Sequence, residues 1–288
     1  MRSKHISALV FIATASIAIE ARADVTTNPI HGKAASTTLS VRRAADSAVL
    51  EKIKARAAAT KSEELIILQV ASNSQFPHVV FKTSQSTDGS AVRTVQSVAK
   101  TVAALTYLLL IRDGRVESLD VPLSKFYPEM ANDERRDLTV RAVLTHSTGI
   151  IDPADLWDMK DLMAGILKIK PSYSVFTQFA YSNAAAELMG NILDRLTPPS
   201  RDPKIDRVID FLNSKVLSQI GVGDLTWARD SDGHLATSGG IMTSRNSLAR
   251  LGLLLLQKGS AGGKVVIERS GSMCFRILLW ASRRAMHS

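Results

Sequence analysis

The chain has 288 residues, of which 45% are hydrophobic and 22% are charged, and its formal net charge is +9 at pH 7. This composition is typical of a globular protein and excludes a chain that is disordered throughout. Because Lys and Arg are dispersed, we expect no nucleic-acid binding, whereas the basic charge would allow association with an anionic cell envelope.

Residues 1–23 have the pattern of a secretory signal peptide. A basic start precedes a mostly apolar run from Ile6 to Ile19, and Ala21-Arg22-Ala23 fits a cleavage site. The run is shorter than the roughly 20 residues of an ordinary membrane-spanning helix. We expect cleavage after Ala23 and a secreted or periplasmic protein; the alternative is an uncleaved, membrane-tethered interaction protein. Residues 24–45 are polar and are predicted to be a linker.

The next segments predict helices and strands in turn. Helical spacing of Lys and Glu predicts a surface helix over 47–61, and the β-branched runs 64–71 and 78–83 predict two paired strands. The apolar residues of 97–111 predict a helix that is buried on most sides and ends at Asp113-Gly114.

Three further helices are predicted over 183–196, 205–220 and 244–257, the last with Ser244 as its N-cap. Strands near the start of the chain followed mostly by helices indicate an α+β fold. No repeat or low-complexity tract is present, and residues 46–268 are predicted to form one domain.

The sequence contains one S-x-x-K motif, Ser97 to Lys100. At the start of a helix this spacing puts a hydroxyl and an amine one turn apart on the same face. A serine is a weak nucleophile without an adjacent base, and the positive potential of a helix N-terminus favours a developing oxyanion. The alternative is a serine that caps the helix, followed by a surface lysine.

A second motif, Tyr181-Ser182-Asn183, opens the helix predicted over 183–196. A phenol can exchange a proton with a nucleophile or a leaving group, and the Asn183 amide can both donate to and accept from a substrate amide. The alternative is an asparagine cap with an aromatic staple.

Together the two motifs resemble the beta-lactamase-related serine hydrolases, which include class C beta-lactamases, D-alanyl-D-alanine carboxypeptidases and lactamase-like esterases. The stretch 95–150, with Leu144-Thr145-His146-Ser147-Thr148-Gly149, is similar to the family's L-T-H-x-S-G turn. Residues 217–227 resemble the P-L-G-M loop, and Ser238 to Ser244 with the following L-A-R resemble the helix before the third motif.

The resemblance implies an antiparallel sheet flanked by helices, with a helical subdomain between Ser97 and about Asn183. It implies that Ser97 is the acylated nucleophile, Lys100 its general-base partner and Tyr181 a second acid/base. Asn183 would bind the substrate carbonyl or amide, and the backbone N–H of Ser97 would supply half of an oxyanion hole.

The family's third motif, K-[ST]-G or H-x-G, does not occur in the sequence. His146 and His234 lack a glycine two positions on and are interpreted as loop or turn histidines. Residues 269–288 form an atypical basic tail where the family would continue with strands. We expect a premature stop, with C-terminal strands missing; the alternative is a naturally short variant whose tail touches membranes.

The prediction is a serine hydrolase that acts through an acyl-enzyme on a small-molecule or peptide substrate: an amide, an ester or a β-lactam. The alternative is a non-catalytic, truncated relative that binds cell-wall peptide or is not functional. No cofactor or metal is implied. The single Cys274 excludes an intrachain disulfide and a cysteine-based zinc site. The oligomeric state is left open.

Overall fold

The structure is a computed structural model that describes residues 47–59, 65–69, 78–83, 90–261 and 263–267. The predicted signal peptide, linker and basic tail lie outside these ranges, so those predictions and the domain boundaries 46–268 stay predictions. Within the described ranges, no helix combines the length and the apolar character that crossing a bilayer requires.

The described residues fall into two compact units: the described residues from 47 to 90 with 261, 263 and 264, and residues 91–260 with 265–267. In the first unit, helix α1 (Ser47–Ala59) is followed by the antiparallel strands β1 (Leu65–Gln69) and β2 (His78–Thr83). Their register shifts at a bulge between Ile67 and Leu68. The helix and the paired strands predicted for this region are confirmed.

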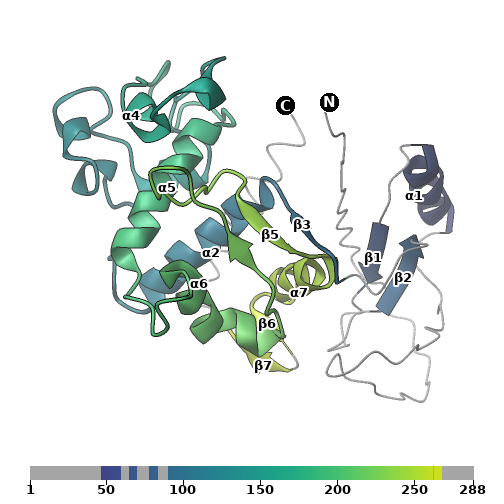
Figure 1. The fold of residues 1–288 in the computed structure, drawn as a ribbon. Helices are drawn as coiled ribbons and strands as arrows, with labels where there is room; N and C mark the ends of the chain where they lie inside the picture. The colour runs from purple at the N-terminus through teal and green to yellow at the C-terminus, as the bar shows by residue number, and fades with distance from the viewer. Residues whose placement is uncertain (1–46, 60–64, 70–77, 84–89, 262, 268–288) are drawn as a thin grey trace. The chain divides into compact units, whose positions relative to one another are not determined.

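The second unit contains most of the helices (Figure 1). They are α2 (Val98–Arg112), α3 (Val140–Leu144), α4 (Leu162–Ile166), α5 (Asn183–Leu196), α6 (Arg207–Leu212) and α7 (Arg245–Leu256). Short helical turns lie between them: η1 (Leu123–Lys125), η2 (Pro128–Asn132), η3 (Leu156–Asp158), η4 (Asn213–Leu217) and η5 (Ser218–Ile220).

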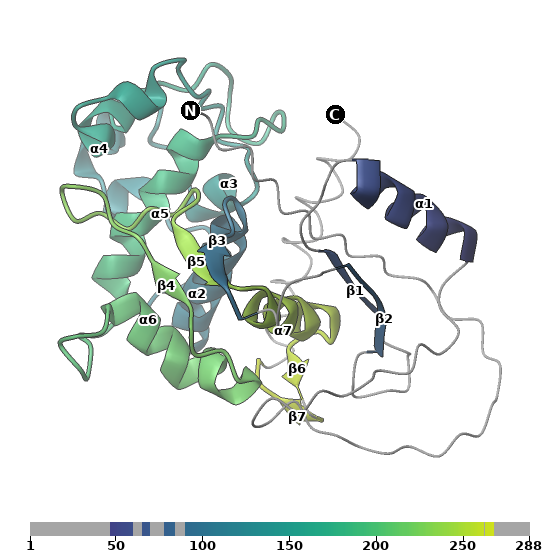
Figure 2. The ribbon, with the colours of Figure 1, turned by 45° about the vertical axis from the view of Figure 1, so that its right-hand side comes forward.

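A three-stranded antiparallel sheet lies beside α2 in the second unit (Figure 2). Its central strand is β5 (Ile241–Ser244), flanked by β3 (Val92–Thr94) and β4 (Thr226–Trp227). The strands β6 (Ser260–Ala261) and β7 (Lys264–Val265) form a separate pair. An α+β fold with antiparallel sheets and helices is confirmed.

Helices α2 and α5 pack against each other in the core of the second unit. The apolar residues that predicted α2 are buried along most of the helix. This is expected of a helix that carries apolar side chains on nearly every face. A buried phenol links this core to the loops: the Tyr127 hydroxyl donates to the carbonyl of Leu188 at 2.6 Å. The fully buried side chains include Tyr107, Leu109, Leu110, Met130, Leu188 and Ile192.

Two of the predicted segments differ in the structure. The helix predicted over 205–220 is α-helical only in α6, because Asp206 caps its start and the chain then widens into the π-helical η4. Residues 241–244, expected to belong to a helix, form β5 instead. The helix begins after Ser244, whose hydroxyl accepts a hydrogen bond from Ser247 N–H as a helix cap.

Candidate active site

Ser97 lies at the point where β3 gives way to α2. The Val95 N–H donates to the carbonyl of Ile241 in β5, and Gln96 then takes a positive φ of 50°. This left-handed residue turns the chain sharply, so that Ser97 is exposed at the helix start. Its side chain makes no capping hydrogen bond. This observation argues against the alternative that Ser97 serves only as a helix cap.

The Lys100 side chain reaches three oxygen acceptors. Its Nζ lies 3.2 Å from Ser97 Oγ, 2.8 Å from Asn183 Oδ1 and 2.7 Å from the carbonyl of Ser238. Asn183 Oδ1 and the Ser238 carbonyl can only accept, so Lys100 donates an N–H to each, whereas the Ser97 hydroxyl can donate or accept. Lys100 is half-buried and held from three segments of the chain, which excludes the alternative of a free surface lysine.

Tyr181 completes the group around Ser97. Its hydroxyl donates to Ser97 Oγ at 2.7 Å, and its ring centroid lies 4.8 Å from Lys100 Nζ. The cap of α5 is not Asn183 but Ser182, whose hydroxyl accepts from Ala185 N–H. The structure therefore brings together all four residues that the sequence motifs singled out.

His146 supports this group from inside the protein. The residue is buried, and its Nδ1 accepts a hydrogen bond from the backbone N–H of Ser182. Burial lowers the pKa of His146 to about 4, and the nearby charge of Lys100 acts in the same direction. A neutral ring that accepts at Nδ1 carries its proton at Nε2. His146 is thus a buried neutral residue in contact with Tyr181, as well as a turn residue with φ of 52°.

Two carboxylates also belong to the site, although the sequence analysis did not single them out. Asp152 accepts hydrogen bonds from Ser182 Oγ, from Asn183 at N and Nδ2, and from Ala184 N, each at 2.9 Å. Burial acts to raise the pKa of Asp152, but these hydrogen bonds outweigh it and hold the pKa below its usual value. Asp152 is therefore ionised at neutral pH.

The second carboxylate, Glu187, lies on α5 and is only 4% exposed. Its Oε2 accepts from Thr237 N–H at 2.9 Å and its Oε1 from Ser238 N–H at 3.2 Å. No sequence signal pointed to this residue, because it is one of several polar positions within a predicted helix.

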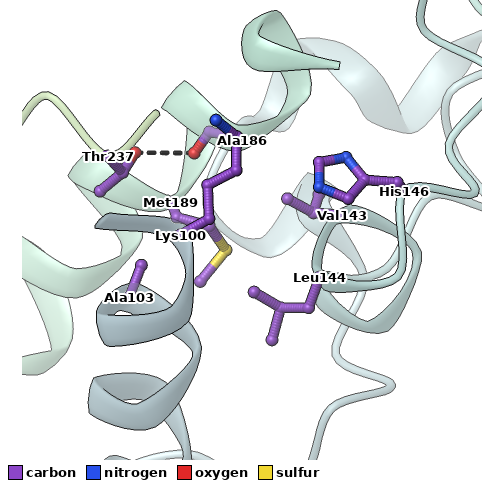
Figure 3. A pocket seen from close by; sticks show the side chains of 8 residues that line it. All are labelled: Lys100, Ala103, Val143, Leu144, His146, Ala186, Met189 and Thr237. Carbon is purple, nitrogen blue, oxygen red and sulfur yellow. Dashed lines mark hydrogen bonds between the residues drawn. The ribbon is translucent and has the colours of Figure 1, made fainter. Parts of the chain in front are cut away.

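A small cavity of about 20 Å³ lies next to the aliphatic part of Lys100 (Figure 3). Its polar lining comes from Lys100, His146 and Thr237, and the rest is apolar. A space of this size holds about one water molecule. Ser97 is not among the residues that line this cavity; it is exposed to solvent, as is Tyr181, which is 47% exposed.

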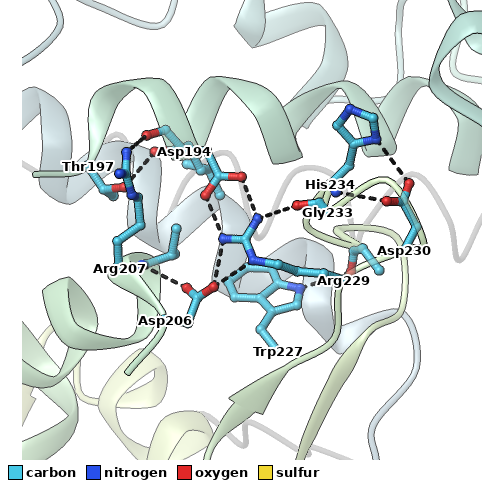
Figure 4. Close-up of polar contacts among 12 residues, drawn as sticks. Asp194, Thr197, Asp206, Arg207, Trp227, Arg229, Asp230, Gly233 and His234 are labelled. Atoms are coloured by element: carbon cyan, nitrogen blue, oxygen red, sulfur yellow. Dashed lines mark hydrogen bonds and ion pairs between the residues drawn. The ribbon is translucent and has the colours of Figure 1, made fainter. Parts of the chain in front are cut away.

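One group of side chains in the described part of the chain has metal-ligand character, namely Asp230, Asp232 and His234. The Asp230 carboxylate already accepts hydrogen bonds from the backbone N–H groups of Asp232 and His234 and contacts the His234 ring at 3.1 Å (Figure 4). These bonds stabilise a tight surface turn. The histidine is thus a turn residue, as the sequence indicated, and the group does not contribute to the site around Ser97.

The family model named Beta-lactamase matches residues 78–276, more than half of the chain. The chain belongs to the beta-lactamase family. One relative is the 6-aminohexanoate-dimer hydrolase of Paenarthrobacter ureafaciens, which is 25% identical to this chain over 214 residues. The match covers 67% of this chain and 52% of that enzyme, so the chain spans about half of the relative's length.

Solved structures place this family member in the same fold. A class C beta-lactamase from Rhodobacter sphaeroides has a TM-score of 0.56 at 16% identity, covering 77% of this chain and 68% of that one. A penicillin-binding protein homologue from Caulobacter crescentus has a TM-score of 0.56 at 17% identity, covering 78% of this chain and 73% of that one. The predicted relatedness to hydrolases of the beta-lactamase type is confirmed.

Proposed function

We propose that the chain is a serine hydrolase that forms an acyl-enzyme at Ser97. The observation that carries this proposal is the position of Ser97 Oγ, which lies within hydrogen-bonding distance of both Lys100 Nζ and Tyr181 Oη. A nucleophile in contact with groups that can take and return its proton is the arrangement that acyl transfer requires.

In the proposed reaction, Ser97 Oγ attacks the carbonyl carbon of an amide or ester. Its proton passes to Lys100 Nζ, whose own N–H groups donate to Asn183 Oδ1 and the Ser238 carbonyl, as the new C–O bond is made. Tyr181 donates a proton to the leaving nitrogen or oxygen as the scissile bond breaks. Water then attacks the acyl-enzyme, gives up its proton to the same groups and releases the acid, which restores the Ser97 hydroxyl.

The backbone around Ser97 supports an oxyanion-binding role. Within the described residues, the Ser97 N–H makes no hydrogen bond to another backbone group, and it lies at the N-terminal end of α2. An N–H at a helix start is directed toward developing negative charge. We propose that it supplies one of the two donors that a tetrahedral intermediate needs.

Asn183 retains the capacity to bind substrate. Its Oδ1 faces Lys100 and one of its amide hydrogens is donated to Asp152. A side-chain amide has a second N–H, which remains to donate to a substrate carbonyl. The substrate classes that fit are an ester, a short amide, a β-lactam or a D-Ala-D-Ala peptide.

Covalent labelling tests the proposal. A fluorophosphonate probe and a fluorescent penicillin are incubated with the purified protein, and the labelled residue is identified by mass spectrometry. We expect label on Ser97, loss of label in Ser97→Ala, and unchanged label in Ser231→Ala, which changes an exposed serine in a surface turn. A folded wild-type protein that takes up neither probe would favour the non-catalytic alternative.

A further inference from the structure

Lys100 is held by oxygens whose segments are held in turn by two acidic residues, the half-buried Asp152 and the buried Glu187. Of its three acceptors, only Ser97 Oγ belongs to its own helix start; Asn183 Oδ1 and the Ser238 carbonyl come from distant segments. Each of these two segments is bonded to a carboxylate, Asp152 in one case and Glu187 in the other.

Asp152 determines which end of the Asn183 amide faces Lys100. A carboxylate can only accept hydrogen bonds, so it requires the N–H end of the amide, whereas a lysine N–H requires the amide oxygen. The Asn183 Nδ2 must therefore point to Asp152, at 2.9 Å, and its Oδ1 to Lys100, at 2.8 Å. Because Asp152 also accepts from the backbone N–H groups of Asn183 and Ala184, it fixes the main chain at the same time.

Glu187 has the corresponding effect on the other acceptor. By accepting from the consecutive N–H groups of Thr237 and Ser238, it anchors this turn to α5. The carbonyl of Ser238 is thereby directed to Lys100 Nζ at 2.7 Å. A buried carboxylate is costly unless its oxygens are hydrogen-bonded, and here both oxygens are used on the turn.

We propose that Asp152 and Glu187 are positioning residues for Lys100 in the proposed reaction. Neither carboxylate contacts the lysine or the nucleophile in the described structure; each acts through one oxygen acceptor. Without them the acceptors move or turn away, Lys100 is no longer held next to Ser97, and acylation slows while the binding of substrate persists. The expected effect on the acylation rate rests on the proposed function, whereas the positioning of Lys100 does not.

The first test measures the position of Lys100 without using activity. The protein is treated with a limiting amount of an amine-acetylating reagent, and the extent of acetylation at Lys100 is read by peptide mass spectrometry. We expect Lys100 to react severalfold faster in Asp152→Asn and in Glu187→Gln than in the wild type, because its nitrogen has lost an acceptor. Unchanged Lys100 reactivity in both folded variants would overturn the proposal.

The second test separates binding from acylation through the concentration dependence of probe labelling. We expect the limiting labelling rate to fall by roughly 100-fold, as for a reacting group that is slightly displaced, with the half-saturating probe concentration unchanged. A rise in that concentration with an unchanged limiting rate would contradict positioning. If the wild type takes up no probe, the proposed function fails, while the acetylation test still decides the positioning.

The matched control is Asp210→Asn. Asp210 on α6 is buried, as Glu187 is, and accepts hydrogen bonds from Arg201; among the described residues it makes no hydrogen bond to the segments around Lys100. We expect wild-type Lys100 reactivity and labelling in this variant. Should Asp152→Asn fail to fold by circular dichroism, Asp152→Ser removes the carboxylate without placing an NH₂ group against the amide donors of Asn183.

Discussion

The ring of Tyr181 lies against the imidazole of His146, with ring centroids 4.5 Å apart and planes inclined by 25°. His146 is bonded to the backbone N–H of Ser182, the residue next to Tyr181. A neutral imidazole thus supports the phenol from one side, while the phenolic hydroxyl points to Ser97. Ring stacking and hydroxyl chemistry at Tyr181 can therefore be separated by mutation.

Tyr181→Phe keeps the stacked ring and removes only the hydroxyl. We expect the rate of Ser97 labelling by a fluorophosphonate to fall by roughly 100-fold or more, the usual contribution of an acid/base group. The melting temperature should change little. Tyr173→Phe, which removes the hydroxyl of a half-buried tyrosine elsewhere, is expected to label at the wild-type rate. Equal rates for the two variants would exclude the proposed role of Tyr181.

The buried His146 makes stability depend on pH. Its pKa is lowered to about 4 in the folded protein, from an ordinary value of 6.5 for histidine. The unfolded chain therefore binds the extra proton first, and the stabilisation, complete above about pH 6.5, is lost as the pH falls toward 4. The full difference is on the order of 3 kcal/mol.

His146→Asn should reduce this pH dependence. Asparagine tolerates the positive φ at this position and can offer an oxygen to the Ser182 N–H, but it does not titrate. We expect urea unfolding midpoints of the wild type to drop more steeply between pH 7 and pH 4 than those of the variant. Parallel curves would show that His146 does not cause the acid sensitivity.

Arg229 links three parts of the second unit (Figure 4). Its guanidinium donates to the carboxylates of Asp194 and Asp206 at 2.7 Å and to the carbonyl of Gly233. We expect Arg229→Met to lower the free energy of unfolding by roughly 2 kcal/mol, because several charge-assisted hydrogen bonds are lost together.

The control for Arg229 is a surface pair of the same chemistry. Arg136 lies 3.8 Å from Asp137, and both side chains are 70% exposed. Arg136→Met should change the unfolding free energy by less than about 1 kcal/mol. Chemical denaturation of both variants at low and high salt measures the difference.

Gly190 lies where α5 meets the 228–236 hairpin. A Cβ atom at this position would come within 2.4 Å of the Leu235 carbonyl oxygen, which is a backbone atom. We expect Gly190→Ala to destabilise the protein by roughly 1–3 kcal/mol, despite alanine's better helix propensity. Gly223→Ala has no atom within 4 Å of the added carbon and should be close to neutral in the same thermal melts.

The sequence predicted those parts of the fold whose signals are local. Helices α2, α5 and α7 were recognised because each combines an apolar face with a serine at its start. Strands β3, β4 and β5 were not, because each has only 2 to 4 residues and cannot show the alternation of a longer strand.

The residues of the candidate site likewise divide into those marked by a local sequence motif and those marked only by contacts with distant residues. Ser97, Lys100, Tyr181 and Asn183 lie in short motifs and were predicted, and the geometry brings them together. Asp152 and Glu187 could not be singled out, because their partners are 30 to 51 positions away and nothing in their neighbouring residues marks them. Such contacts exist only after the chain has folded.

The acceptors of Lys100 are spread over much of the sequence, since the Ser238 carbonyl is 138 residues further along. A nascent chain that ends before this point cannot complete the arrangement, however well its early helices have formed. Proteolytic fragments that separate the two segments would lose it too. Reactivity at Ser97 would then report on folding of the second unit as a whole, appearing late in biosynthesis and vanishing early in unfolding.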